Sequence, residues 1–172
     1  MGMPGATALA FTQGYLGFTG IDKVVSSTVS GREAHIGVGF ALPSNPPGTA
    51  TAAVLHLVRY GADANAPWEV VGSADTSLTL TAPAYGAHAA SPLTAGGTIT
   101  GVDDDVRVQT RQPSTTAPLG RSGPDPAGGT NTPWTTKATF TGATDPVLTV
   151  VAYTGGHLQA VERFAVTAIR TG

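Results

Sequence analysis

The sequence predicts a mainly β protein in two parts: a small α+β unit over residues 4–73 and an antiparallel β-sandwich over residues 74–172. Three observations support this prediction. A single helical stripe stands near the start of the chain, short alternating apolar runs follow it, and the chain contains 23 glycines and 13 prolines. Alternating runs bounded by turn residues are typical of antiparallel sheets, and the short spacing of the later runs is typical of a sandwich.

Residues 6–18 predict the one helix. Ala8, Phe11, Tyr15 and Phe18 recur at spacings of three and four residues, which places them on one helical face. A helix this short is only marginally stable alone in water. We therefore expect its apolar face to pack on a sheet.

Three antiparallel strands are expected after the helix, over residues 35–42, 51–60 and 68–72. Each run alternates apolar residues with small or polar ones, which is the period of a strand. The segments SNPPG at 44–48 and GADANAP at 61–67 carry the turn residues that connect them. One helix on three strands completes the predicted α+β unit.

The second part shows short alternating runs at sandwich spacing. They are Ser77–Thr81, Leu93–Thr100, Asp105–Arg111, Trp134–Thr141, Val147–Tyr153 and Leu158–Arg170. Two glycines in the segment Thr154–His157 predict a tight hairpin. Residues 112–133 contain five prolines, and we expect them to form a long exposed, mobile loop.

Composition excludes several classes of protein. The formal net charge is −2 with only two lysines, so a basic surface for nucleic acid is absent. No run approaches the 18 or so apolar residues of a membrane span. The chain has no cysteine, which excludes disulfides, thiol nucleophiles and zinc–thiolate sites.

The low charge and the abundance of Thr, Ala and Gly favour an exported protein over a cytoplasmic one. No signal peptide is visible at the start of the sequence. We expect the native protein to be extracytoplasmic, with an export signal or lipid anchor that this chain lacks and with membrane contact only through such an anchor. The expected partner is another envelope component, and the expected state is a monomer.

Asp103, Asp104 and Asp105 form the only charge cluster, and calcium is the cation that such a run would attract. Neighbouring strand residues point to opposite faces, so the three carboxylates converge only in a loop. The spacing also differs from that of calcium-binding loops. A solvated turn is the favoured interpretation, and no cofactor or metal is expected.

Catalytic signatures are missing. The four histidines, His35, His56, His88 and His157, show no helical metal-ligand spacing, and no GxSxG, GxGxxG or GxxxxGK[ST] motif occurs. A non-enzyme is therefore expected. The alternative is a hydrolase whose Ser, His and Asp are assembled only by folding.

A second alternative is a small-ligand binding protein. A helix on a curved sheet can enclose an apolar pocket. Its lining would come from five aromatic residues, Phe11, Tyr15, Phe18, Phe40 and Trp68. The competing interpretation is that these side chains fill the core.

The stretch from Trp68 to Ile169 resembles the immunoglobulin-like domain that accompanies GerM-type domains in sporulation and germination proteins of Gram-positive bacteria. The resemblance rests on the segments WEVVGSADTSLTLTAP, SPLTAGGTITG, VRVQT, WTTKATFTG, VLTVVAYTGG and VERFAVTAI. The upstream helix and strands are similar to the region preceding this domain in exported actinobacterial proteins. The segment before residues 105–110 departs from the family, because Val102–Asp105 replaces an aromatic-Glu-Gly step. The resemblance implies an immunoglobulin-like, extracytoplasmic, non-catalytic module and supplies no catalytic residue.

Overall fold

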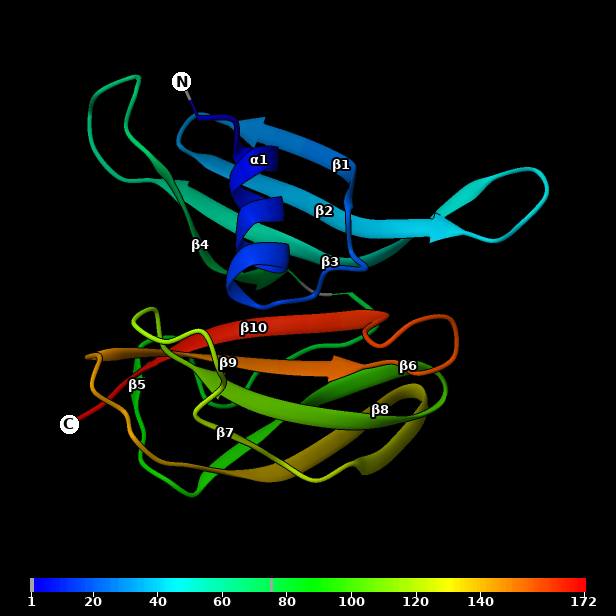
Figure 1. Ribbon diagram of the computed structural model, residues 1–172, viewed down its shortest axis with the longest axis vertical. Coiled ribbons are helices and arrows are strands. Elements are labelled where there is room, and N and C mark those ends of the chain that lie inside the picture. The colour runs from blue at the N-terminus through cyan, green and yellow to red at the C-terminus, as the bar shows by residue number, and fades with distance from the viewer. Residues whose placement is uncertain (1, 75) are drawn as a thin grey trace. The chain divides into compact units, whose positions relative to one another are not determined.

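The computed structural model describes residues 2–74 and 76–172, with the side chains of all of these except Val102 and Asp103. The chain divides into two compact units, Met1–Ala74 and Asp75–Gly172, each built on its own sheet (Figure 1). The protein is mainly β with one short helical segment, as the sequence predicts.

The first unit contains one helical segment and a four-stranded antiparallel sheet. Helix α1 (Pro4–Leu9) continues directly into the π-helical turn η1 (Ala10–Tyr15). The strands follow in sheet order as β1 (Lys23–Ser30), β2 (Glu33–Leu42), β3 (Gly48–Arg59) and β4 (Trp68–Ala74). Pro4 suits the first helical position because its missing N–H has no partner there. The helix crosses one face of the sheet (Figure 1).

The core of this unit lies between the helix and that face of the sheet. Ala34, Ile36 and Val38 of β2 are buried, whereas the alternating Glu33 and His35 are exposed on the other face. This is the strand period that the sequence predicts. The helical segment contributes the buried residues Ala8, Thr12 and Leu16, and β3 contributes Ala53, Leu55 and Leu57.

The sheet has four strands where the sequence predicts three. The added strand, β1, lies at the sheet edge and is exposed at seven of its eight positions. Because it buries almost nothing, its residues KVVSSTVS show no apolar alternation. The turn to β2 is Gly31–Arg32, and Gly31 has a φ of +60°, a conformation that glycine adopts without strain.

The second unit contains six strands. They are β5 (Ala87–His88), β6 (Leu93–Arg111), β7 (Gly120–Arg121), β8 (Asp125–Phe140), β9 (Val147–Thr154) and β10 (Arg163–Arg170). The order is β5-β10-β9-β6-β7-β8, and β6 also pairs directly with β8. All pairings are antiparallel except that of β5 with β10.

Strand β6 gives this unit its sandwich-like form. Its first part, from Leu93 to Val106, pairs with β8, and its last part, from Arg107 to Arg111, pairs with β9. The register with β8 shifts on both sides of Gly101, and such irregularities let a strand bend. One continuous strand therefore belongs to both pairings.

The apolar residues enclosed by these strands form one cluster. Its members are Leu78, Leu93, Ala95, Ile99, Val106, Val108, Trp134, Ala138, Phe140, Leu148, Val150, Ala152 and Ile169. The indole Nε1 of Trp134 donates a hydrogen bond to the carbonyl of Thr79 at 3.1 Å. Trp134 is thus a core residue whose one polar atom has a partner.

The predicted strands differ from the observed ones in three places. Residues 77–81 run beside β6 but contribute only isolated bridges, such as Leu78 with Ile99. The runs predicted at 93–100 and 105–111 are one strand, because β6 continues through the bend. The last strand begins at Arg163 rather than at residue 158.

The prediction of a mobile loop over residues 112–133 is wrong for the second half of this segment. Strand β7 and the first part of β8 occupy it, and β8 includes Pro126 and Pro133. Over this stretch the pairing of β8 is with β6 alone. A strand paired on one side tolerates proline, because the missing N–H falls on the unpaired side. Proline content alone therefore misidentified an edge strand as a loop.

Candidate functional site

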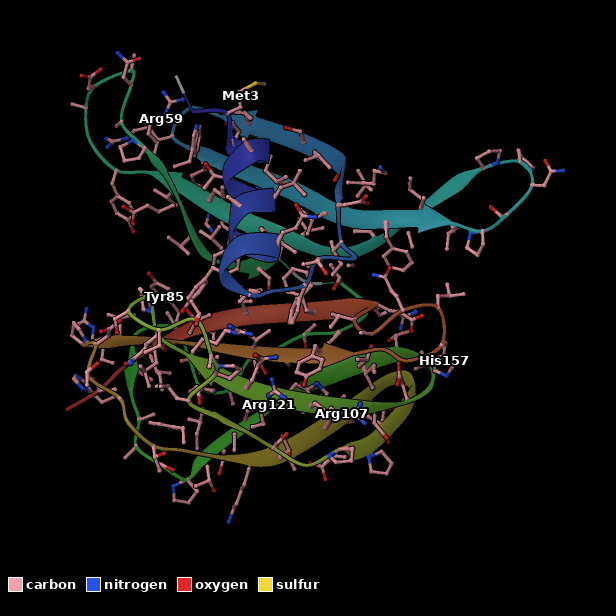
Figure 2. The ribbon with its side chains drawn as sticks, viewed as in Figure 1. Met3, Arg59, Tyr85, Arg107, Arg121 and His157 are labelled. Atoms are coloured by element: carbon pink, nitrogen blue, oxygen red, sulfur yellow. The ribbon has the colours of Figure 1, made fainter. Side chains whose placement is uncertain are left out.

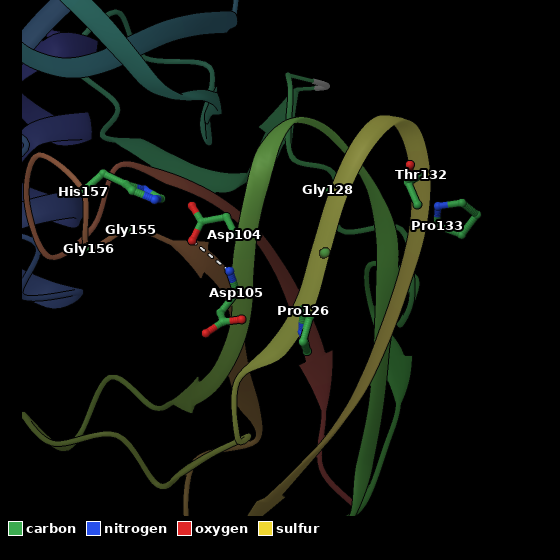
Figure 3. Close-up of a pocket in the computed structure, with 10 residues that line it drawn as sticks. Asp104, Asp105, Pro126, Gly128, Thr132, Pro133, Gly155, Gly156 and His157 are labelled. Carbon is green, nitrogen blue, oxygen red and sulfur yellow. Dashed lines mark hydrogen bonds between the residues drawn. The ribbon is translucent and has the colours of Figure 1, made fainter.

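A cleft of about 690 Å³ lies in the second unit (Figure 3). Three segments form it: the middle of β6, the first part of β8 and the loop between β9 and β10. The lining residues are Asp104, Asp105, Pro126, Ala127, Gly128, Thr132, Pro133, Gly155, Gly156 and His157. This volume is within the range of small-molecule sites in proteins.

Three ionisable side chains gather beside the cleft. Asp104 comes from β6, and His157 and Glu162 come from the β9–β10 loop. Their potential ligand atoms all lie within 4.8 Å of one another. His157 Nδ1 is 3.5 Å from Glu162 Oε2, and Figure 3 shows the imidazole facing the Asp104 carboxylate.

The β9–β10 loop is held in shape by its own hydrogen bonds. Gly156, at a φ of +112°, donates its N–H to the carbonyl of Gln159 at 2.7 Å. The carboxylate of Glu162 accepts the backbone N–H groups of Leu158 and Gln159. The side chain of Glu162 is only 13% exposed, whereas that of His157 is 59% exposed. His157 thus projects from an ordered loop (Figure 2).

These contacts change the acidity of Glu162. Burial opposes its ionisation, but hydrogen bonds from the backbone of Leu158, Gln159 and His157 and from the His157 side chain outweigh it. The pKa of Glu162 therefore lies below its ordinary value. The carboxylate is the form that the loop is built to hold.

In the acidic run Asp103–Asp105, the side chains of Asp104 and Asp105 have different partners. Asp104 joins the cluster, and its Oδ1 accepts the N–H of Asp105 at 2.8 Å. In Figure 3 the Asp105 carboxylate points away from His157, and one of its oxygens lies 3.8 Å from the guanidinium of Arg107. The side chain of Asp103 lies outside the described residues. Asp104 and Asp105 lie within strand β6, so the expectation of a solvated turn is wrong for them. Their side chains diverge, as strand geometry predicts for consecutive residues.

Sequence reasoning missed the site because its other two members carry no motif. His157 has no metal-ligand spacing to another histidine, and Glu162 stands inside the predicted run Leu158–Arg170. The two are brought together because the connection is a loop from Gly155 to Glu162 rather than a tight hairpin. A histidine and a glutamate five residues apart in a glycine-containing connection are the only signal that the sequence offered.

The aromatic residues predicted as pocket lining lie in the first unit. Phe18, Phe40 and Trp68 are buried, and Phe11 and Tyr15 are half-buried with ring centroids 5.4 Å apart. None of these five lines the cleft of Figure 3. Trp68 instead has the guanidinium carbon of Arg59 4.6 Å from its ring centroid, a cation–π distance.

Two further histidines form a pair on the first unit. His35 and His56 face each other across β2 and β3, and their rings stack at 4.8 Å with planes 4° apart. His56 Nε2 is 3.7 Å from a carboxylate oxygen of Glu33. The partners that the structure gives to His56 and His157 are thus carboxylates rather than serine hydroxyls.

No family model, curated protein or solved structure matches this chain. In the part of the chain that the structure describes, no helix has the length and apolar character needed to cross a membrane. The site must therefore be interpreted from its own chemistry.

Proposed function

We propose that this protein is a non-catalytic binding module and that the cleft of the second unit takes an uncharged, hydroxyl-rich ligand such as a short glycan. The observation that carries the proposal is the lining of the cleft. It offers the carboxylates of Asp104 and Asp105 and the hydroxyl of Thr132, and no lysine or arginine is among its lining residues.

Carboxylates are strong acceptors for hydroxyl donors, and a hydroxyl group can both donate and accept. Negative lining disfavours phosphate or carboxylate ligands, because like charges repel and the nearby Arg107 guanidinium is already paired with Asp105 at 3.8 Å. Pro126 and Pro133 add apolar surface against which the C–H face of a sugar ring can pack. The residues that line the cleft therefore suit a neutral polyol better than an anion.

Two arrangements support binding rather than catalysis. Asp105 lies near Arg107, and Glu162 is occupied by backbone N–H groups. Thr132 is the only hydroxyl side chain among the residues that line the cleft. A hydrolase of the Ser–His–Asp type would need a hydroxyl nucleophile in hydrogen-bond reach of a base.

The cellular setting of the proposal comes from the sequence. The low charge and the resemblance to immunoglobulin-like domains of sporulation and germination proteins support an extracytoplasmic module, and we propose that it acts as a monomer. An envelope glycan is a ligand available in that setting. Locating the native gene start and measuring the mass by light scattering test the location and the monomer separately.

A glycan array probed with the full chain tests the ligand class, and titration calorimetry with a neutral oligosaccharide from the array gives the affinity. We expect Thr132→Val and Asp105→Asn to weaken binding. Thr130→Val is the matched control, since Thr130 is exposed on the same strand and does not line the cleft. Binding to no neutral glycan, or binding that Thr132→Val and Asp105→Asn leave unchanged, contradicts the proposal.

A further inference from the structure

We infer that Asp104, His157 and Glu162 form a site for one divalent transition-metal ion of the zinc type at the edge of the cleft. The role of this ion in ligand binding rests on the proposed function, whereas binding of the ion itself does not. The three side chains supply one imidazole nitrogen and two carboxylates, a donor set known for zinc in proteins.

The distances fit such an ion with little movement. Zinc lies about 2.0–2.2 Å from nitrogen and oxygen ligands, so tetrahedral ligand atoms are about 3.3–3.6 Å apart. His157 Nδ1 and Glu162 Oε2 already lie 3.5 Å apart, and no pair in the cluster exceeds 4.8 Å. The exposed His157 side chain is free of the core and can rotate to close the remaining gap.

The carboxylates are oriented by hydrogen bonds of their own. The N–H of Asp105 binds Asp104 Oδ1, and the N–H groups of Leu158 and Gln159 bind Glu162 Oε1. Partners of this kind fix the direction of metal ligands and increase affinity. The two carboxylates also balance the charge of a divalent cation.

The donor set discriminates among cations. Calcium takes six to eight oxygen ligands, and magnesium keeps much of its water, so neither gains from an imidazole nitrogen. Imidazole suits zinc and its neighbours in the first transition row. Three protein ligands leave a fourth position open, and the adjoining cleft is where a ligand hydroxyl would occupy it.

Calorimetric titration of the full chain with Zn²⁺ at pH 7 tests the site. We expect one ion per chain and no comparable binding of Ca²⁺ or Mg²⁺. Asp104→Asn and His157→Ala should each weaken binding more than about tenfold, since even outer-shell changes cost that much. Glu162 is left intact because its carboxylate also holds the loop.

Three matched controls accompany these variants. Asp63→Asn changes an exposed carboxylate of the first unit, and His88→Ala removes an exposed histidine from β5. His56→Ala removes the stacked pair on the first unit. All three should bind Zn²⁺ as the parent does. Binding that persists in Asp104→Asn and His157→Ala, or that is lost only in His56→Ala, overturns the inference.

Absorption of the Co²⁺-loaded protein provides a second readout that does not depend on affinity alone. We expect visible bands of a four- or five-coordinate nitrogen and oxygen site, and their loss in His157→Ala. A spectrum like that of hexahydrated Co²⁺ in the parent protein overturns the inference.

The glycan assay repeated with chelator separates the two proposals. Zinc binding without any glycan binding leaves the metal site standing and refutes the proposed function. Glycan binding that is unchanged by chelator, with no zinc binding, supports the proposed function and refutes the metal site. Loss of glycan binding with chelator and its recovery with Zn²⁺ supports both.

Discussion

Replacing Gln112 by alanine tests how the second unit satisfies polar groups in its interior. Gln112 is 1% exposed and follows the end of β6. Its Oε1 accepts the backbone N–H groups of Thr144 at 2.9 Å and Asp145 at 3.1 Å, and its Nε2 donates to the carbonyl of Gly142 at 3.4 Å. One side chain thus anchors the connection between β8 and β9.

Alanine removes the acceptor of two backbone N–H groups at once. Thr144 is exposed and Asp145 is half-buried, so water can reach their N–H groups and each hydrogen bond lost costs about 0.5–1.5 kcal/mol. We expect the free energy of unfolding of this unit to fall by about 1–3 kcal/mol, a large part of the roughly 5–15 kcal/mol that stabilises a domain.

Native-state hydrogen exchange measured by NMR checks both the size and the place of the effect. The slowest amides of β9 report unfolding of the unit, and those of Thr144 and Asp145 report the connection. A loss of about 1–3 kcal/mol corresponds to roughly 5- to 150-fold faster exchange. Gln159→Ala is the control, since Gln159 is partly buried and donates one side-chain hydrogen bond. Exchange at Thr144 and Asp145 that stays within about threefold of the parent would refute the reasoning.

Three other predictions concern single contacts. Trp134→Phe removes the bond to the Thr79 carbonyl and part of the core volume, so calorimetry should show a loss of about 1–3 kcal/mol, and no loss would argue against a buried bond. Gly31→Ala should lower the free energy of unfolding of the first unit by about 1 kcal/mol, because Gly31 has a positive φ. Gly14→Ala, in the helical segment, should raise it by up to about 1 kcal/mol. Changes of the same sign in urea unfolding of the two variants would contradict this prediction. The lowered pKa of Glu162 adds stability above its unfolded value of 4.5 that is lost as pH falls through the folded value. With chelator present, the parent and Glu162→Gln should therefore differ less in their urea unfolding midpoints at pH 3 than at pH 7. A difference that does not change with pH would contradict the role given to the Glu162 carboxylate.

The parts of the fold that were predictable are those in which burial alternates along the chain. Ala34 and Ile36 in β2, and Trp134, Ala138 and Phe140 in β8, are buried in alternation with exposed residues because one face packs on a core. Strand β1 escaped prediction for the opposite reason. Its residues are exposed on both faces, so its pairing with β2 leaves no trace in hydrophobicity.

The candidate site was less predictable than the fold. Strand geometry predicts that Asp104 and Asp105 point to different sides, but not which of the two meets His157. Its meeting with His157 and Glu162 depends on how a loop more than 50 residues later folds back on β6, as the numbering shows. That contact is long-range and carries no sequence period, so no local pattern encodes it.

The shared strand β6 has a consequence for how the second unit forms. Its first residue, Leu93, pairs with Ala138, and its last residue, Arg111, pairs with Thr149. Both ends of β6 therefore pair with residues that lie far along the chain. The chain loses conformational entropy when such large loops close, before strand pairing stabilises the sheet. Proteins in which most contacts join distant residues therefore fold slowly. Neither layer can be completed without the other, and we expect refolding on the millisecond-to-second scale with no half-formed sheet accumulating.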